Sequence, residues 1–111
     1  MRVVQTVSHY DGRVRKRDKW TWAVRLDGTA QELKTVQYVV YELHESYRDP
    51  IQIVDDPRNN FRLFGASYGS FTIGVEIYFK HGTPGMSGKK LKAKIKLRLF
   101  YPTGLYHRIE D

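Results

Sequence analysis

Residues 71–80 read FTIGVEIYFK, and their side chains alternate between apolar and mostly polar types with a period of two. Successive side chains of a β-strand point to opposite faces, so this stretch predicts a half-buried antiparallel strand. The opposite face, which carries Thr72, Glu76 and Lys80, would meet water. The apolar side chains that would share the buried face are Phe71, Ile73, Val75, Ile77 and Phe79.

The same period recurs on both sides of this strand. Residues 20–26 (WTWAVRL) and 91–99 (LKAKIKLRL) each keep one apolar face. Residues 36–43 (VQYVVYEL) are apolar on both faces, which predicts an internal strand. With turn signals between them, about seven or eight short strands predict an all-β, immunoglobulin-like antiparallel β-sandwich. Weaker strand signals lie at residues 2–8, 51–54 and 61–64.

A chain of 111 residues is long enough for one hydrophobic core, so we expect a single domain over residues 1–111. Residues 31–34 would form one helical turn at most, and the segments 11–19 and 81–89 are expected to be mobile loops. Three lysines, Lys92, Lys94 and Lys96, should point to water. The expected core consists of Trp22, Val24, Val40, Phe71, Ile73, Val75, Ile77, Ile95 and Leu97.

The composition argues against several classes of protein. The absence of cysteine excludes a disulfide scaffold and a thiolate metal site, and it suits a reducing compartment. The four histidines are dispersed without metal-ligand spacing, so we expect no metal and no other cofactor. The chain has neither a long apolar run nor the apolar region of a signal peptide, so we expect a cytoplasmic protein without membrane contact.

The formal charge of +7 raises the alternative of nucleic-acid binding. Basic residues alternate along residues 89–98, and a second basic cluster lies in residues 13–19. Strand alternation alone would place the first cluster on a solvated face, where lysines also discourage edge-to-edge association. Aromatic residues are not interleaved with these charges as in a single-strand-binding groove. Solvated faces are therefore favoured, with contact to a nucleic acid or an acidic partner as the alternative.

Candidate ligand-binding residues stand at the ends of two predicted strands. Residues 41–47 read YELHESY, and residues 67–71 read SYGSF after the small residues Gly65 and Ala66. Two aromatic rings and a hydroxyl on neighbouring loops suit a flat, neutral, amide-like group, and the small residues permit close backbone approach. The residues that would form this slot are His44, Ser46, Tyr47, Tyr68 and Gly69.

A catalytic interpretation of the same residues is weaker. His44 and Ser46 are two positions apart and would suit a hydrogen-bonded base and nucleophile. Such a pair also needs an orienting acid and an oxyanion hole, and nothing in the sequence marks either of them. The sequence therefore predicts a binding module and not an enzyme.

Residues 36–80 resemble the central block of the YEATS domain family. That block contains a V-x-F-x-LH-x-S-F strand and loop, an aromatic–glycine turn and an F-x-I-x-I-x-I-x-F strand. The Trp-Thr-Trp strand upstream and the late KIKLRLFYP strand also fit the layout of the family. The resemblance implies an immunoglobulin-like sandwich that acts as a reader of acylated lysine on a protein partner.

The resemblance also implies a role for each candidate residue. Tyr47 and Tyr68 would form the two aromatic walls of the slot, and Ser46 would hydrogen-bond the acyl-amide group. His44 would line the slot and steady its loop, while the backbone N–H groups at Tyr68 and Gly69 would hold the acyl oxygen. The free lysine would be excluded, because an ammonium group loses more hydration than a neutral amide on entering an aromatic slot.

Two departures from the family pattern distinguish this chain. The segment 12–19 carries charges and no aromatic ring, where many acyl-lysine readers supply a further aromatic residue. Arg48 stands where a proline usually follows the loop aromatic. The Trp-Thr-Trp strand and the compact length look like the prokaryotic branch of the family. A structural interaction domain with a vestigial slot is the remaining alternative.

Overall fold

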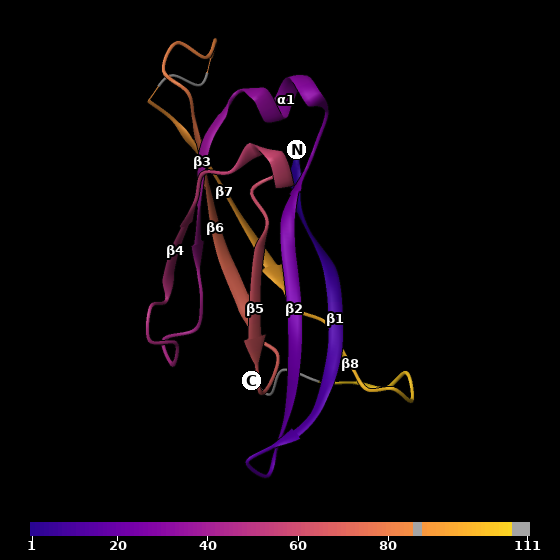
Figure 1. The fold of residues 1–111 in the computed structure, drawn as a ribbon. Coiled ribbons are helices and arrows are strands. Elements are labelled where there is room, and N and C mark those ends of the chain that lie inside the picture. Colours follow the sequence, from indigo (N-terminus) through magenta and orange to yellow (C-terminus); the bar gives the residue numbers. More distant parts are fainter. Residues whose placement is uncertain (86–87, 108–111) are drawn as a thin grey trace.

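Two antiparallel sheets pack face to face in the computed structural model (Figure 1), which describes residues 1–85 and 88–107. One sheet has the strand order β1-β2-β5, and the other has the order β4-β3-β6-β7. The predicted immunoglobulin-like sandwich is therefore confirmed, and 36–43 is internal as expected. The strands are β1 (Arg2–Val14), β2 (Arg17–Asp27), β3 (Val36–Glu42), β4 (Ile51–Val54), β5 (Leu63–Ser67), β6 (Thr72–Phe79) and β7 (Lys90–Lys96).

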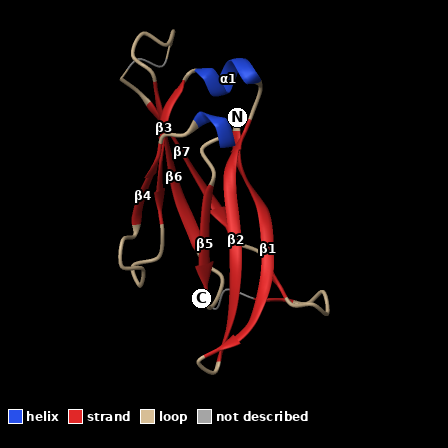
Figure 2. Cartoon of the chain, in the orientation of Figure 1, coloured by secondary structure: helices blue, strands red, loops and turns tan. Residues whose placement is uncertain are grey.

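Shorter elements complete the described chain. β8 (Leu99–Phe100) and β9 (Tyr106–His107) form a small two-stranded ribbon. The helix α1 (Ala30–Lys34) and the 3₁₀ helix η1 (Pro57–Asn59) lie at the upper end of the sandwich (Figure 2). No helix in the described parts of the chain is both long and apolar enough to cross a membrane.

The core between the sheets contains all but two of the expected residues. Ile95 is only partly buried, because β7 is an edge strand, yet it still packs against the core. Val40 was assigned to the core wrongly. A register shift between Val36 and Tyr38 moves the alternation of β3 by one residue, so Val39 points inward and Val40 points outward. The largest fully buried side chains include Trp20, Trp22, Tyr41, Phe61, Leu26 and Ile73.

The expected mobile loop at 11–19 is instead the end of a long hairpin. β1 and β2 remain paired to Val14 and Arg17, and the turn consists of Arg15 and Lys16 alone. Both turn residues have positive φ, 53° and 67°, as a two-residue hairpin turn requires. Asp11-Gly12 is a dipeptide that commonly marks a turn, but here Gly12 lies at a bulge within the pairing. The other expected loop, 81–89, includes residues 86–87, which lie outside the described residues.

One buried hydrogen bond joins the core to the chain segment before β5. The Tyr41 hydroxyl donates to the backbone oxygen of Phe61 at 2.7 Å, and burial raises the pKa of this phenol. Tyr41→Phe leaves that carbonyl unpaired in the core, so the free energy of unfolding should fall by about 1–2 kcal/mol in chemical denaturation. Tyr38→Phe is the matched control, since the described residues give the Tyr38 hydroxyl no hydrogen bond. Equal losses in the two variants would contradict this role.

Candidate ligand-binding site

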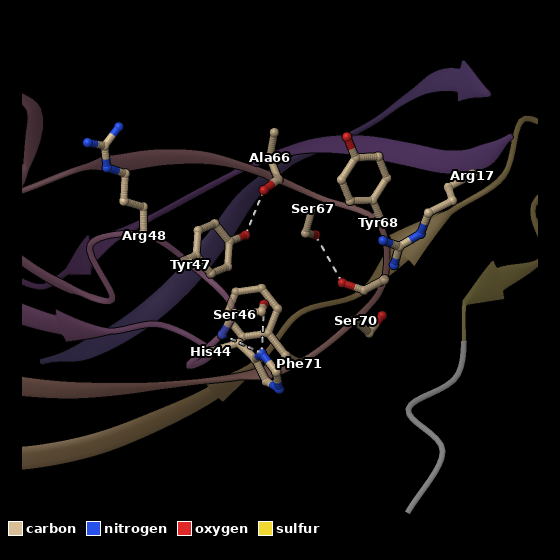
Figure 3. Close-up of a pocket in the computed structure, with 11 residues that line it drawn as sticks. Arg17, His44, Ser46, Tyr47, Arg48, Ala66, Ser67, Tyr68, Ser70 and Phe71 are labelled. Carbon is tan, nitrogen blue, oxygen red and sulfur yellow. Dashed lines mark hydrogen bonds between the residues drawn. The ribbon is translucent and has the colours of Figure 1, made fainter. Parts of the chain in front are cut away.

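A cavity of about 590 Å³ opens at the lower end of the sandwich, where three segments meet. These segments are the start of β2, the connection from β3 to β4 and the connection from β5 to β6 (Figures 1 and 3). The two connections contain most of the motifs YELHESY and SYGSF, respectively. The lining residues are Arg17, His44, Ser46, Tyr47, Arg48, Ala66, Ser67, Tyr68, Gly69, Ser70 and Phe71.

His44 and Ser46 form a hydrogen-bonded unit within the β3–β4 connection. Nδ1 of His44 accepts the backbone N–H of Ser46 at 3.1 Å and lies 2.8 Å from Ser46 Oγ. Because Nδ1 accepts an N–H, the neutral ring carries its proton on Nε2. The Ser46 hydroxyl then donates to Nδ1 and keeps its own oxygen lone pairs for a ligand N–H.

Tyr47 forms a fixed wall of the cavity. Its hydroxyl donates to the backbone oxygen of Ala66 at 2.6 Å, which ties the β3–β4 connection to β5. Its ring packs against Phe71 with a centroid distance of 5.5 Å. Burial raises the pKa of the Tyr47 phenol, and the neighbouring Trp22 and Ser67 side chains lower it in part. The phenol is therefore neutral at physiological pH, and this wall adds no charge to the cavity.

Tyr68 forms an exposed aromatic wall on the β5–β6 connection. The Arg17 guanidinium lies over its ring, with 4.4 Å between Cζ and the ring centroid. In Figure 3, Arg17 and Tyr68 lie on one side of the cavity, whereas Tyr47, Ser46 and His44 lie on the other. The Ser67 hydroxyl donates to the backbone oxygen of Gly69 at 2.9 Å, which stabilises the turn that presents Tyr68.

Gly65 serves the core and not the cavity. It pairs with Trp22 across β5 and β2, and a Cβ built on Gly65 would overlap the buried indole ring. From the sequence, Gly65 was interpreted as a residue that lets a ligand approach the backbone. The structure shows that the close neighbour is Trp22, whose ring supports β5 directly beside the site.

Similarity to known proteins identifies the family. A family model for the prokaryotic YEATS domain matches residues 20–85, which is more than half of the chain. The chain belongs to this family. The YEATS resemblance predicted from residues 36–80 is therefore confirmed, and the match includes all of the predicted site residues.

Two curated relatives resemble part of this YEATS domain. The Protein AF-9 homologs of Kluyveromyces lactis and Eremothecium gossypii are 34% and 35% identical to it over 61 and 60 residues. Each match covers 54% of this chain but only 26% and 28% of the two relatives. The chain thus spans about a quarter of the length of these curated relatives.

Solved structures share the fold of this YEATS domain. The Yaf9 YEATS domain recognising an H3K122suc peptide has a TM-score of 0.61 at 23% identity, covering 95% of this chain and 71% of that one. The Yaf9 YEATS domain bound to H3K27ac also has a TM-score of 0.61 at 23% identity, with 94% and 71% covered. These likenesses establish the YEATS immunoglobulin-like fold for this chain.

The structure brings the five predicted site residues of this YEATS domain together around one cavity. His44, Ser46 and Tyr47 come from the β3–β4 connection, and Tyr68 and Gly69 come from the β5–β6 connection. Their contact with a ligand stays a prediction. Phe71 was placed in the core by its position in the β6 pattern, and it is both buried and part of the cavity wall.

Sequence reasoning missed the two arginines that line the cavity. Arg17 was assigned to a basic loop, and Arg48 was noted only as a departure from the family pattern. A two-residue turn at Arg15 and Lys16 places Arg17 at the first position of β2, facing Tyr68. Neither Arg15 nor Lys16 is a residue that normally marks such a turn, so no local signal pointed to this position of Arg17.

The lysines of β7 lie elsewhere, on the outer face of their sheet. Lys92 and Lys94 are exposed, as expected, and so is Lys96. They neighbour acidic side chains, because Lys92 and Lys94 line a groove with Glu42 and Glu76. Lys90 also forms an ion pair with Glu76, which lowers the pKa of that carboxyl. The basic strand is therefore partly balanced by acidic residues on the same face.

Proposed function

We propose that this YEATS domain is a non-enzymatic reader module that holds a neutral acyl-amide group between Tyr47 and Tyr68. The ligand class is acylated lysine on a protein partner. The observation that carries the proposal is the Ser46 oxygen, which His44 orients as a hydrogen-bond acceptor at a cavity with two aromatic walls. A secondary amide supplies the N–H that this acceptor needs.

Each residue then has a defined role toward the amide. Ser46 Oγ accepts the amide N–H, and His44 keeps the hydroxyl in its orientation. The rings of Tyr47 and Tyr68 stack on the flat group and add about 0.5–1.5 kcal/mol per ring contact beyond buried area. The backbone N–H groups at Tyr68 and Gly69 hold the acyl oxygen, as the family resemblance implies.

The charge of the cavity favours an acylated lysine over a free lysine. Arg17 and Arg48 line the cavity, and no acidic residue is among its described lining. An ammonium group would meet two guanidinium groups and would also lose hydration in the aromatic slot. Acylation removes the ammonium charge, so both penalties disappear.

The arrangement of His44 and Ser46 supports binding better than catalysis. A nucleophilic serine needs a base that is itself oriented by a third group, usually an acid. In the described lining of the cavity, no carboxylate is present to orient His44. The histidine instead accepts from the Ser46 backbone, which fixes the loop.

Proteins that share the fold support the ligand class. The Yaf9 YEATS domain is described with an H3K122suc peptide and, in another structure, with H3K27ac. We therefore propose an acylated peptide as the ligand of this domain.

Calorimetric titration with acetylated, crotonylated and unmodified forms of one lysine peptide tests the proposal. The acylated forms should bind at least about tenfold more tightly than the unmodified form, because only they fill the slot without burying a charge. Equal affinity for all three peptides would refute the reader function and leave a structural interaction domain.

Nucleic-acid binding is the alternative that the basic hairpin tip favours. Arg13, Arg15 and Lys16 lie at the tip of the β1–β2 hairpin (Figure 1), and Arg17 follows them at the start of β2. Phosphate-driven affinity falls steeply with salt, whereas stacking on a neutral amide changes little. Affinity for a single-stranded oligonucleotide that exceeds affinity for every acylated peptide, with a steep salt dependence, would favour this alternative.

A further inference from the structure

We propose that Arg17 makes this site selective for a ligand that carries a carboxylate beside the acyl-amide group. This inference rests on the proposed reader function and narrows its ligand class. Arg17 lines the cavity, and its guanidinium lies 4.4 Å from the centroid of the Tyr68 ring. A ligand that stacks on Tyr68 therefore lies next to this guanidinium.

Among the described residues Arg17 has no acidic partner, in contrast to several other arginines of the chain. Arg58 pairs with Asp56 at 3.1 Å, and Arg2 pairs with Asp27 at 3.4 Å. Within residues 1–85 and 88–107, no carboxylate pairs with the Arg17 or Arg48 guanidinium. The cavity thus presents positive charge that the described part of the protein does not neutralise.

The hydrogen-bonding groups of Arg17 are available to a ligand. Its Cζ lies over the Tyr68 ring, and no described residue forms a hydrogen bond or an ion pair with its guanidinium. The guanidinium N–H groups match the two oxygens of a carboxylate in a bidentate pair. The Tyr68 ring therefore stacks on the ligand amide, and the Arg17 guanidinium beside this ring pairs with the ligand carboxylate.

The backbone holds Arg17 in place. Arg17 pairs with Val14 directly after the Arg15-Lys16 turn, at the first position of β2. Arg48 lies on the other side of the cavity in Figure 3 and extends away from Tyr47. Arg48 adds positive potential on its own side of the cavity, whereas Arg17 lies close to the Tyr68 ring. We therefore assign selectivity to Arg17.

Two sources of carboxylate fit this position. One is an acyl chain that ends in a carboxylate, as in succinyl-lysine. The other is an Asp or Glu side chain next to an acetyl-lysine in the peptide. The shared chemistry is a carboxylate within reach of both the amide and the guanidinium.

Three peptides of one neutral sequence separate these sources. They carry acetyl-lysine, succinyl-lysine, or acetyl-lysine followed by Glu, and each is titrated at low salt into the wild-type domain and two variants. Arg17→Gln removes the cation. Arg62→Gln is the matched control, because Arg62 lies over the Phe64 ring at the same 4.4 Å but does not line the cavity.

At least one carboxylate peptide should bind the wild type about three- to tenfold more tightly than the neutral acetyl peptide. Arg17→Gln should remove this difference, and Arg62→Gln should keep it. Moderate salt should reduce it, because the pair is near the surface. The peptide that shows the gain identifies the source of the carboxylate.

The outcomes separate this inference from the proposed function. Equal binding of all three peptides, or a carboxylate preference that survives Arg17→Gln, overturns the inference and leaves the reader function in place. Binding of no acylated peptide above the unmodified peptide overturns both. Thermal unfolding of Arg17→Gln should show the same cooperative transition as the wild type, which establishes that the variant is folded. Arg17→Lys keeps the charge without the planar guanidinium, so it should retain part of the preference.

Discussion

Gly65→Ala should lower the free energy of unfolding by about 3 kcal/mol, measured by chemical denaturation. Gly65 pairs with Trp22, and a Cβ at this position would overlap carbons of the buried indole ring. The ring cannot move freely, because Trp22 packs edge-on against Phe71 with a centroid distance of 6.0 Å. The backbone of β5 must shift instead, and that displacement reaches Ala66, which accepts the Tyr47 hydrogen bond.

Gly74→Ala is the control for this prediction. Gly74 also lies in the middle of a strand, but a Cβ there would lie 3.5 Å from Cβ of Glu42, an ordinary contact. We expect no loss of stability, and a gain of up to about 0.5 kcal/mol, because alanine loses less backbone freedom on folding than glycine. Similar losses in the two variants would mean that any side chain in these strands is harmful and that Trp22 has no special part.

Ser46→Ala should weaken binding of an acylated peptide by about ten- to a hundredfold, corresponding to about 1–3 kcal/mol. The Ser46 oxygen is oriented by His44 to accept the ligand amide N–H, and alanine leaves that N–H unpaired in the slot. The thermal unfolding temperature should change little, because Ser46 is exposed in a connection between strands. Titration calorimetry of the variant measures the loss.

Tyr68→Phe provides the comparison within the same site. The ring and its contact with Arg17 remain, and only the phenol oxygen is removed, so we expect a smaller loss than for Ser46→Ala. The opposite ranking, with the Tyr68 hydroxyl essential and Ser46 dispensable, would show that the site recognises its ligand through the phenol. The proposed position of the amide would then be wrong.

Much of the fold follows from local alternation of side chains. The pattern Phe71 to Phe79 predicts β6 and its buried face, because a period of two is set by backbone geometry alone. The inward position of Val39 in place of Val40 could not be predicted, since the bulge near Tyr38 leaves no mark in the residue types. A bulge depends on pairing with the neighbouring strand, which is a tertiary property.

The hairpin turn at Arg15 and Lys16 is a second feature that local sequence patterns did not predict. Glycine or asparagine normally marks such a turn, because both turn residues need positive φ. Here two long basic residues adopt φ of 53° and 67°, while the nearby Gly12 lies at a bulge. An Asp-Gly pair commonly marks a turn, but Asp11-Gly12 does not lie at the turn of this hairpin.

Local sequence motifs predicted one part of the site but not the other. His44, Ser46 and Tyr47 are close in sequence and Tyr68 begins the β5–β6 connection, so local motifs at two strand ends were enough to group them. Arg17 joins the site only through the register of the β1–β2 hairpin and the pairing of β2 with β5. Pairing of this kind is long-range, so the sequence alone suggested a basic loop and not a cation on an aromatic wall.

Nuclear magnetic resonance with an acetylated and an unmodified form of one lysine peptide tests the central claim most directly. The reader function predicts saturable shifts of Ser46, Tyr47 and Tyr68 with the acetylated peptide only. The resonances of Lys92 and Lys94, on the outer face of the second sheet, should stay in place. Shifts of the β7 lysines and the hairpin tip that are equal for both peptides, with Tyr47 and Tyr68 unmoved, would contradict a slot for the acyl-amide group.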